Sequence, residues 1–357
     1  MVNGRYQRQI ILSDFGEKGQ AALKKSKVLV VGAGGLGVPV LVYLNAMGVG
    51  TLGIVDADKV SKSNLHRQVL YTDAMVGQPK VVAAKDQLKA QNPETKIDIY
   101  QVFLGTDNAL EIIEKYDLVV DASDNFPTRY LINDACVVLK KPFVYGALHG
   151  FEGQVSVFNY KNGPTYRCLF PTMPNADEVP NCNEHGVLGI LPGIIGNFQA
   201  LEVVKVLTDL RGVLSGVLLL YDALSQQSRQ IRFKLNPENL KLTGLAESYD
   251  FDCNTKVKSI EPLQIQKLLS KGHIELVDVR TKQEFDKIHL KGAKNIPLNM
   301  LEREKDTINM SGTVYLICQS GVRSQKAVLL MQKLFPDKEF INVKGGMNLV
   351  GTYANTY

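Results

Sequence analysis

The chain has 357 residues, of which 45% are hydrophobic and 22% charged, the composition of a globular protein long enough for two domains. Its formal net charge of +5 is a mild excess that is not gathered into a run, so we expect no nucleic-acid partner and favour an acidic protein partner or an anionic substrate. The longest apolar stretch, residues 187–207, is too interrupted for a membrane span, because it contains Pro192, Asn197, Gln199, Glu202 and Lys205.

The cysteines and the beginning of the chain bear on the compartment. Five cysteines are scattered without a C-x-x-C pair, which predicts a reducing compartment with one or two reactive thiols rather than a disulfide framework. No Arg-rich presequence or signal opens the sequence, so we expect a cytoplasmic location.

A glycine turn follows the first predicted strand. Gly32, Gly34 and Gly37 have the G-x-G-x-x-G spacing that lets backbone N–H groups approach a phosphate at a helix N-terminus. The next strand, residues 51–55, ends at Asp56, where a carboxylate can meet a ribose hydroxyl. Hydride-transfer enzymes and adenylating enzymes both use this fingerprint, so the turn alone does not choose between them.

Strands and helices alternate up to residue 147. Helices are predicted at 38–47, 79–90, 109–115 and 128–139, and strands at 96–103, 117–122 and 142–147. This order predicts an α/β fold with a Rossmann-like, doubly wound, mostly parallel sheet. From His149 the hydrophobic period becomes two, which predicts an antiparallel extension, and a long loop follows at 163–185. The first segment, residues 5–15, is expected to be an arm that lies on another element or subunit.

A polar, irregular stretch divides the chain. We therefore predict a first domain at 1–236, a linker at 237–258 and a smaller α/β domain at 259–357. The second domain contains predicted strands at 275–279 and 313–317 and a predicted helix at 325–334.

Charged residues follow successive strands of the first domain. Asp56 suits a ribose, Arg67 and Lys80 suit phosphates, and Asp124 suits a Mg²⁺ ion that bridges them. Lys80 lies near the start of a predicted helix and is expected to have a free ammonium. The structural alternative is that Arg67 and Lys80 are solvated and that Asp124 caps a helix. An NAD enzyme would not need two cations and a second carboxylate here, so a dehydrogenase is disfavoured and a nucleoside triphosphate is the expected ligand.

The motifs GAGGLG, VDAD, SNLHRQ, GQPK and DASDN resemble the adenylation domain of the MoeB/ThiF family, relatives of ubiquitin-activating enzymes. The resemblance implies that ATP adenylates the C-terminal glycine of a ubiquitin-like sulfur-carrier protein. It also implies a homodimer in which Arg8 reaches the partner's site. The nucleotide-site residues implied are Gly35, Asp56, Ser63, Asn64, Leu65, His66, Arg67, Lys80, Asp124 and Asn125, with Asp124 on the metal.

Two cysteines of the first domain bear on this resemblance. Cys182 matches the family's loop cysteine that is proposed to bond with the activated carrier, and a thiol is a suitable nucleophile for an acyl adenylate. Relatives usually hold a structural zinc with two C-x-x-C pairs. Here Thr165 and Cys168 replace the first pair and residues 236–245 lack the second, so we predict no zinc and a loop held by packing.

The second domain has its own reactive thiol. Cys318 ends a predicted strand and opens the loop Cys318–Ser324, where backbone N–H groups and a helix dipole can stabilise a thiolate or persulfide. With VDVRTKQEF and HLKGAKNIP, this region resembles a rhodanese domain. The resemblance implies a persulfide on Cys318, with Arg323 orienting the loop and the incoming anionic donor. Asp278 and Arg280 are predicted to be a structural ion pair.

Together these patterns predict a carrier-activating enzyme fused to a sulfurtransferase. The Cys318 persulfide, loaded by a donor such as a cysteine desulfurase, would convert the adenylated carrier into a thiocarboxylate for molybdopterin, thiamine or tRNA thiolation. The alternative is a carrier-binding scaffold with degenerate sites.

Overall fold

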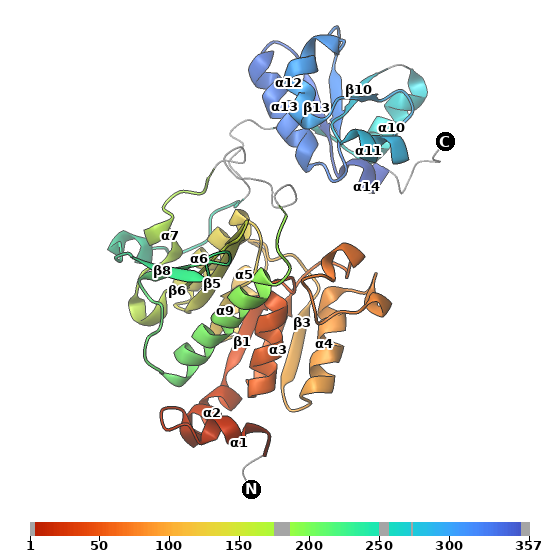
Figure 1. The fold of residues 1–357 in the computed structure, drawn as a ribbon. Helices are drawn as coiled ribbons and strands as arrows, with labels where there is room; N and C mark the ends of the chain where they lie inside the picture. Colours follow the sequence, from red (N-terminus) through yellow and green to blue (C-terminus); the bar gives the residue numbers. More distant parts are fainter. Residues whose placement is uncertain (1–3, 175–185, 250–256, 273, 351–357) are drawn as a thin grey trace. The chain divides into compact units, whose positions relative to one another are not determined.

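The chain folds into two compact units, Met1–Phe251 and Asp252–Tyr357 (Figure 1). The computed structural model describes residues 4–174, 186–249, 257–272 and 274–350. Over these residues, no helix is both long enough and apolar enough to cross a membrane.

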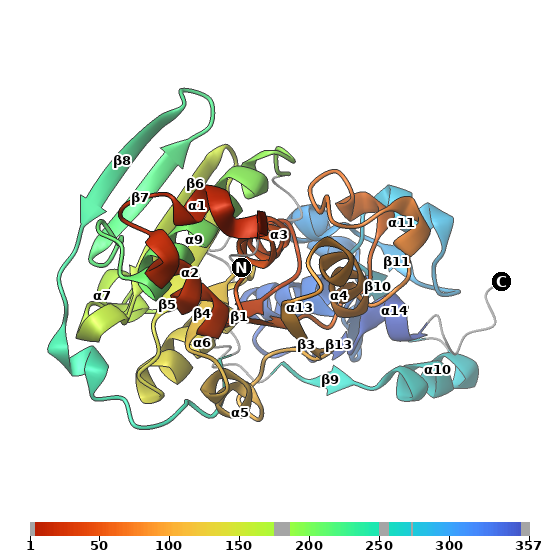
Figure 2. The same ribbon diagram turned by 90° about the horizontal axis from the view of Figure 1, so that it is seen from below.

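The first unit is built on an eight-stranded sheet of order β3-β2-β1-β4-β5-β6-β7-β8. Strands β1 to β5 are parallel, and β6, β7 and β8 continue the sheet in antiparallel pairs. The β7–β8 hairpin forms one edge (Figure 2). The strands are β1 (Lys27–Val31), β2 (Thr51–Val55), β3 (Lys96–Tyr100), β4 (Leu118–Asp121), β5 (Phe143–His149), β6 (Glu152–Phe158), β7 (Val217–Asp222) and β8 (Gln227–Arg232).

Helices cover both faces of this sheet, as the alternation of apolar side chains along β1 requires. Val28 and Val30 pack in one core cluster with α3, α4 and α9, whereas Leu29 and Val31 pack in a second cluster with α5 and α6. The helices are α1 (Gln7–Ile10), α2 (Gly16–Lys25), α3 (Gly37–Met47), α4 (Lys80–Gln91), α5 (Ala109–Glu114), α6 (Phe126–Val138), α7 (Tyr166–Leu169) and α9 (Leu191–Thr208). The doubly wound fold predicted from the sequence is confirmed.

Part of the predicted linker packs on the first unit. A 3-10 helix forms at Pro237–Leu240, and the buried Tyr249 donates a hydrogen bond to Asp134 Oδ2 at 2.7 Å. Asp134 also accepts a hydrogen bond from Arg167 Nε at 2.7 Å, so a buried carboxylate ties this segment down. Composition cannot reveal such a tie, because both partners lie far away in the sequence.

The second unit is a five-stranded parallel sheet of order β11-β10-β12-β13-β9. Its strands are β9 (Ser259–Ile260), β10 (Glu275–Asp278), β11 (Lys294–Asn295), β12 (Val314–Ile317) and β13 (Phe340–Val343). Its helices are α10 (Pro262–Lys271), α11 (Lys282–Lys287), α12 (Leu301–Glu304), α13 (Val322–Leu334) and α14 (Gly346–Val350). Helix α13 begins three residues earlier than predicted, because Gly321 adopts a φ of +92° and ends the loop there.

Candidate active sites

The glycine turn leaves its backbone open toward a cavity. A Cβ on Gly37 would lie 1.8 Å from Gly32 O, and a Cβ on Gly32, which has a φ of +101°, would lie 2.6 Å from Ala122 O. A Cβ on Gly34 would meet only Gln68 Nε2, at 3.7 Å. Helix α3 then begins at Gly37 without a side-chain cap. In its first turn Val38 N already donates to Gly34 O at 3.0 Å and Pro39 has no N–H, so an anion would be met by the backbone of the glycine turn rather than by the first turn of the helix.

Asp56 lies at the end of β2 with both carboxylate oxygens oriented by the backbone. Oδ2 accepts a hydrogen bond from Ala33 N and Oδ1 accepts one from Asp58 N, each at 2.8 Å. Burial raises the pKa of Asp56, and the nearby Lys80 offsets this only in part. The side chain is 10% exposed, so its remaining lone pairs point to few partners besides a ligand.

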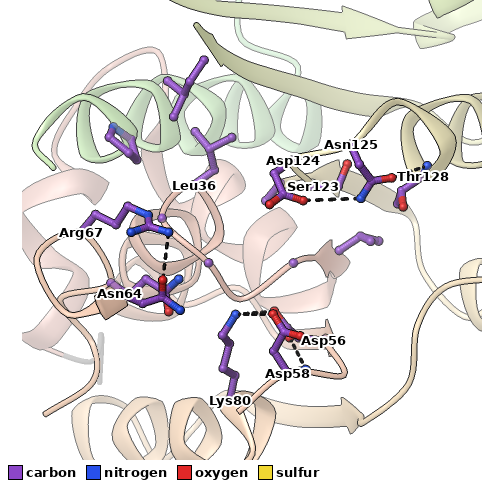
Figure 3. A pocket seen from close by; sticks show the side chains of 18 of the residues that line it. Leu36, Asp56, Asp58, Asn64, Arg67, Lys80, Ser123, Asp124, Asn125 and Thr128 are labelled. Atoms are coloured by element: carbon purple, nitrogen blue, oxygen red, sulfur yellow. Dashed lines mark hydrogen bonds and ion pairs between the residues drawn. The ribbon is translucent and has the colours of Figure 1, made fainter. Parts of the chain in front are cut away.

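Lys80 is the first residue of α4 and is buried, but its ammonium is not free as the sequence suggested. Lys80 Nζ lies 2.8 Å from Asp58 Oδ2 and 3.9 Å from Asp56 Oδ2 (Figure 3). Asp58 is the more exposed partner, with 60% of its side chain accessible. The sequence reasoning missed Asp58, although it is the last residue of the VDAD motif.

Arg67 lies across the cavity from Lys80 and is held by neutral groups (Figure 3). Its Nη2 donates to Asn64 Oδ1 at 2.9 Å, and its Nη1 lies 3.5 Å from Ser63 O and 3.4 Å from His66 Nε2. No carboxylate pairs with Arg67 among the residues that the structure describes. Its charge is therefore not cancelled locally and can serve a phosphate.

Asp124 follows β4, and the structure assigns the helix cap to its neighbour. Asn125 Oδ1 accepts a hydrogen bond from Thr128 N at 2.9 Å and so caps α6, while Asn125 Nδ2 lies 3.5 Å from Asp124 Oδ1. Asp124 therefore does not cap α6, which was the structural alternative for this residue. Asn125, expected to contact the nucleotide, has a capping role.

A buried polar cluster supports the Asp124 loop and was missed by sequence reasoning. Asp121 Oδ1 accepts hydrogen bonds from Ser123 N and Ser123 Oγ, at 3.0 and 2.6 Å. Arg129 Nη2 lies 3.4 Å from Ser123 O. Burial raises the pKa of Asp121, and the nearby positive charge of Arg129 offsets part of this rise. The residue before Asp124 is therefore held from both sides.

These groups surround one cavity of about 450 Å³ (Figure 3). Of the predicted nucleotide-site residues, the structure brings together Gly35, Asp56, Asn64, Arg67, Lys80, Asp124 and Asn125. Ser63, Leu65 and His66 do not line it: Leu65 packs on the core, while Ser63 and His66 contact Arg67. Lining residues that the sequence did not indicate include Asp58, Gln68, Val102, Phe103, Leu104, Thr128, Arg129 and His149.

Two further residues of the first domain were predicted to be catalytic. Arg8 is exposed on α1 and does not line the cavity. Cys182 lies outside the residues that the structure describes.

Hydrogen bonds hold Cys168, at the position where the zinc-binding pairs are degenerate. Its sulfur accepts them from Thr165 N at 3.4 Å, and from Asn236 N and Asn239 Nδ2, each at 3.3 Å. Burial raises the pKa of the Cys168 thiol, but these hydrogen bonds outweigh burial and lower it overall. No group of three or more potential metal ligands occurs within the described part of the chain.

In the second unit, Cys318 is fully buried at the end of β12. Its sulfur accepts a hydrogen bond from Gly321 N at 3.1 Å and lies 3.3 Å from Ser324 Oγ. Ser324 Oγ also lies 2.6 Å from Asn342 Oδ1 on β13. The loop therefore curls around the sulfur, as the cysteine, glycine and serine spacing predicts.

Both arginines that reach this loop are matched with carboxylates. Arg280 and Asp278 form the buried ion pair predicted from the sequence, at 2.7 Å, and Arg280 Nη1 donates to Gln319 Oε1 of the loop at 3.0 Å. Arg323 Nη1 and Nη2 donate to the two oxygens of Glu284, at 2.8 and 2.6 Å. Glu284 was not indicated by the sequence analysis.

The folds and sites define an α/β domain with a cavity lined by charged groups beyond a glycine turn, and a second α/β domain that carries a buried thiol in a loop. Comparison with known families agrees with this class: the ThiF family matches residues 6–242 and the Rhodanese-like domain matches residues 261–351. The chain belongs to the ThiF family and carries a Rhodanese-like domain after the ThiF region.

Individual relatives fit the same assignment. "Adenylyltransferase and sulfurtransferase MOCS3" of Aedes aegypti is 41% identical over 94% of this chain and 82% of its own length. "Sulfur carrier protein adenylyltransferase" of Thermus thermophilus is 54% identical over 65% of this chain and 88% of its own length. A crystal structure of E. coli MccB has a TM-score of 0.61 at 20% identity, over 69% of this chain and 75% of that chain, and supports the fold alone. The chain is thus an enzyme of the adenylyltransferase and sulfurtransferase class.

Proposed function

We propose that the first domain, residues 1–236, uses ATP to adenylate the C-terminal glycine of a ubiquitin-like sulfur-carrier protein in the cytoplasm. After a linker at 237–258, the second domain, residues 259–357, supplies sulfur from a Cys318 persulfide. The observation that carries this proposal is the cavity in which Asp56, Arg67, Lys80 and Asp124 surround an open glycine turn. The relatives named above favour the same activities.

Different residues of the cavity contact different parts of the nucleotide. Asp56 accepts hydrogen bonds from the ribose hydroxyls, since its oxygens are already oriented by two backbone amides. Gly35 and the glycine turn before α3 receive the phosphates through the backbone, Asn64 contacts them, and Arg67 and Lys80 neutralise their charge. The sequence neighbours Ser63 and His66 act through Arg67, which they contact.

Asp124 is the residue that would hold Mg²⁺. The ion usually keeps several waters and binds one or two carboxylates together with substrate phosphates, so a single carboxylate facing a phosphate site fits it without a protein cage. Bound there, the ion would supply charge neutralisation at the phosphates. Asp121 and Arg129 keep the Asp124 loop in place.

Two further roles complete the adenylation half. The chain acts as a homodimer in which Arg8 of one subunit reaches the nucleotide site of the other, in accord with its exposed position on α1. Cys182 bonds covalently with the activated carrier. Analytical ultracentrifugation of the full chain, together with Arg8→Ala, tests the first role; a monomer with full activity would contradict it.

Sulfur transfer starts at Cys318. A persulfide donor, such as a cysteine desulfurase, loads the thiolate; the terminal sulfur then attacks the acyl adenylate, AMP leaves, and an acyl disulfide joins the carrier to Cys318. A second thiol, that of Cys182 or of an external thiol reductant, then attacks the Cys318 sulfur, so that the carrier leaves with the outer sulfur and a disulfide between Cys318 and the attacking thiol remains for an external thiol to reduce. The product is a carrier thiocarboxylate for molybdopterin, thiamine or tRNA thiolation. Mass spectrometry of the small protein captured by the full chain identifies which pathway it serves.

The adenylation half is tested by carrier-dependent exchange of pyrophosphate into ATP. Asp124→Ala should abolish the exchange. Asp98→Asn should retain it, because Asp98 is a partly exposed carboxylate that pairs with Lys96 and does not line the cavity. No exchange with any cognate carrier would contradict the proposal and favour a carrier-binding scaffold with degenerate sites. The intact charged set in the cavity argues against that scaffold.

A further inference from the structure

The charge of Arg323, beside the reactive thiol, is neutralised by its own domain. Arg323 lies on α13 and Glu284 on α11, and their side chains form a two-pronged ion pair at 2.8 and 2.6 Å. The pair is partly accessible, with 24% of the Arg323 side chain and 33% of the Glu284 side chain exposed. Hydrogen bonds from Arg323 lower the pKa of Glu284 to about 2, so the carboxylate stays charged at any working pH.

Arg280 cannot substitute for Arg323 as an anion receptor. It is 1% exposed, and Asp278 occupies its Nε and Nη2 groups. Its remaining donors go to Ile288 O at 2.7 Å and Gln319 Oε1 at 3.0 Å. The two arginines that reach the loop therefore contribute little net charge to an incoming sulfur donor.

The surface beside the loop is instead partly apolar. Val322, the residue after Gly321, is 53% exposed, and Leu349 on α14 is 46% exposed. A Cβ on Gly321 would lie 3.0 Å from Gly345 N, and a Cβ on Gly345 would lie 2.2 Å from Leu349 Cδ1, so Val322 and Leu349 both lie beside the loop. Cys318, at the start of the same loop, is fully buried.

We propose that Glu284 is a specificity-determining residue for the loading of Cys318: by neutralising Arg323 it selects against small dianionic donors, such as thiosulfate, and favours a persulfide presented on a protein surface. The inference rests on the proposed function of Cys318. A dianion gains little at a site without net positive charge and must give up its hydration there, whereas a protein donor also covers the apolar side chains.

The loading step has the same chemistry for both donors. The Cys318 thiolate attacks the outer, sulfane sulfur of the donor and forms a new S–S bond, while the donor's own bond to that sulfur breaks. The bonding electrons leave with the donor, as a thiolate from a protein persulfide or as sulfite from thiosulfate. No oxidant or reductant is needed, so only the charge and shape of the donor distinguish the two reactions.

Two small donors of different charge test the proposal on the full chain. Thiosulfate carries two negative charges, and benzenethiosulfonate carries one together with an apolar ring; cyanide is the acceptor for both. Glu284→Gln should raise kcat/KM for thiosulfate by about tenfold, chiefly through a lower KM, and that for benzenethiosulfonate by less than about threefold. The gain should shrink at high salt.

Matched variants separate charge from loss of structure. Asp286→Asn removes the same charge from the same helix, at a residue that pairs with Lys282 rather than with Arg323, and should leave the ratio of the two donors unchanged. Arg323→Gln should lower activity with thiosulfate, because Glu284 is then uncompensated. The double variant Glu284→Gln/Arg323→Gln should return the donor ratio toward that of the unaltered chain.

Two outcomes would overturn the inference. If Glu284→Gln remains folded at the assay temperature and lowers or leaves unchanged the preference for thiosulfate over benzenethiosulfonate, Glu284 only holds the loop. If Asp286→Asn has the same effect as Glu284→Gln, the pair with Arg323 is not the cause. Failure of the proposed function is distinguishable from both, since it would show as sulfurtransferase activity retained by Cys318→Ala.

Discussion

The two reactive sites use charge in opposite ways. In the first unit, charged side chains face a cavity of about 450 Å³, and Arg67 is held by neutral partners. In the second, the reactive atom is fully buried, and each arginine at the loop is matched with a carboxylate. In the cavity, Lys80 is paired with Asp58 but Arg67 keeps its charge for a ligand, whereas the Cys318 loop surrounds its sulfur with a backbone N–H and a hydroxyl group.

Removal of the thiol is the largest expected perturbation and should separate the two sites. Cys318→Ala should lower thiosulfate:cyanide sulfurtransferase activity by at least about a thousandfold, because no other group can carry the sulfur there. Carrier-dependent pyrophosphate exchange by the same variant should be unchanged, since that reaction belongs to the other unit. A parallel loss of exchange would mean that the two sites are not independent.

Removal of a cation from the cavity tests whether its charge serves the nucleotide. Arg67→Gln should lower kcat/KM for ATP in the exchange assay by about a hundredfold, because no carboxylate is released to compensate. Lys62→Gln is the control: Lys62 precedes the same segment but pairs with Asp73 on the surface. Equal effects of the two variants would show that general surface charge, rather than the cavity, attracts ATP.

Removal of the Asp58 charge should have a smaller effect on the use of ATP than removal of Arg67, and in the opposite direction. Its carboxylate lies 2.8 Å from Lys80 Nζ and so competes with a phosphate for the ammonium. Asp58→Asn should lower the KM for ATP by about threefold, while Asp56, at 3.9 Å, keeps Lys80 oriented. A rise in KM would show instead that Asp58 positions Lys80 for the phosphate.

The smallest expected effect concerns stability and pH in the second unit. The pKa of Glu284 is about 2, below its ordinary value of 4.5, so its ionised form stabilises the fold. That contribution is fully present above 4.5 and is lost as the pH falls through 2. The difference in Tm between the unaltered chain and Glu284→Gln should therefore diminish over this interval. A constant difference would contradict the ion pair as its source.

The sequence predicted much of the nucleotide site because position along the chain determines it. Successive parallel strands end at the same edge of a sheet, so residues just beyond β1, β2 and β4 had to lie near one another. Gly35, Asp56 and Asp124 are of this kind. Glycine spacing indicated the turn for a similar reason, since only residues without a Cβ fit beside Gly32 O and Ala122 O.

The state of the charged groups was not predictable in the same way. Lys80 was expected to have a free ammonium, and Arg323 to meet the incoming donor, yet each is paired with a carboxylate in the structure. Asn125 lines the cavity, as expected of a nucleotide-site residue, but the sequence analysis did not indicate that its side chain also caps α6. Side-chain types and their spacing do not specify which rotamers bring two groups together.

The sequence by itself determined the order of the elements, the residues at the strand ends and the sulfur-holding loop, because these follow from local periodicity and from glycine geometry. Only the tertiary structure decided which charges remain for a ligand. Glu284 and Arg323 are 39 residues apart, and Cys168 and Asn239 are 71 apart. Such pairs form only when the packing of separate elements brings them within hydrogen-bonding distance, and no pattern within either segment specifies that distance.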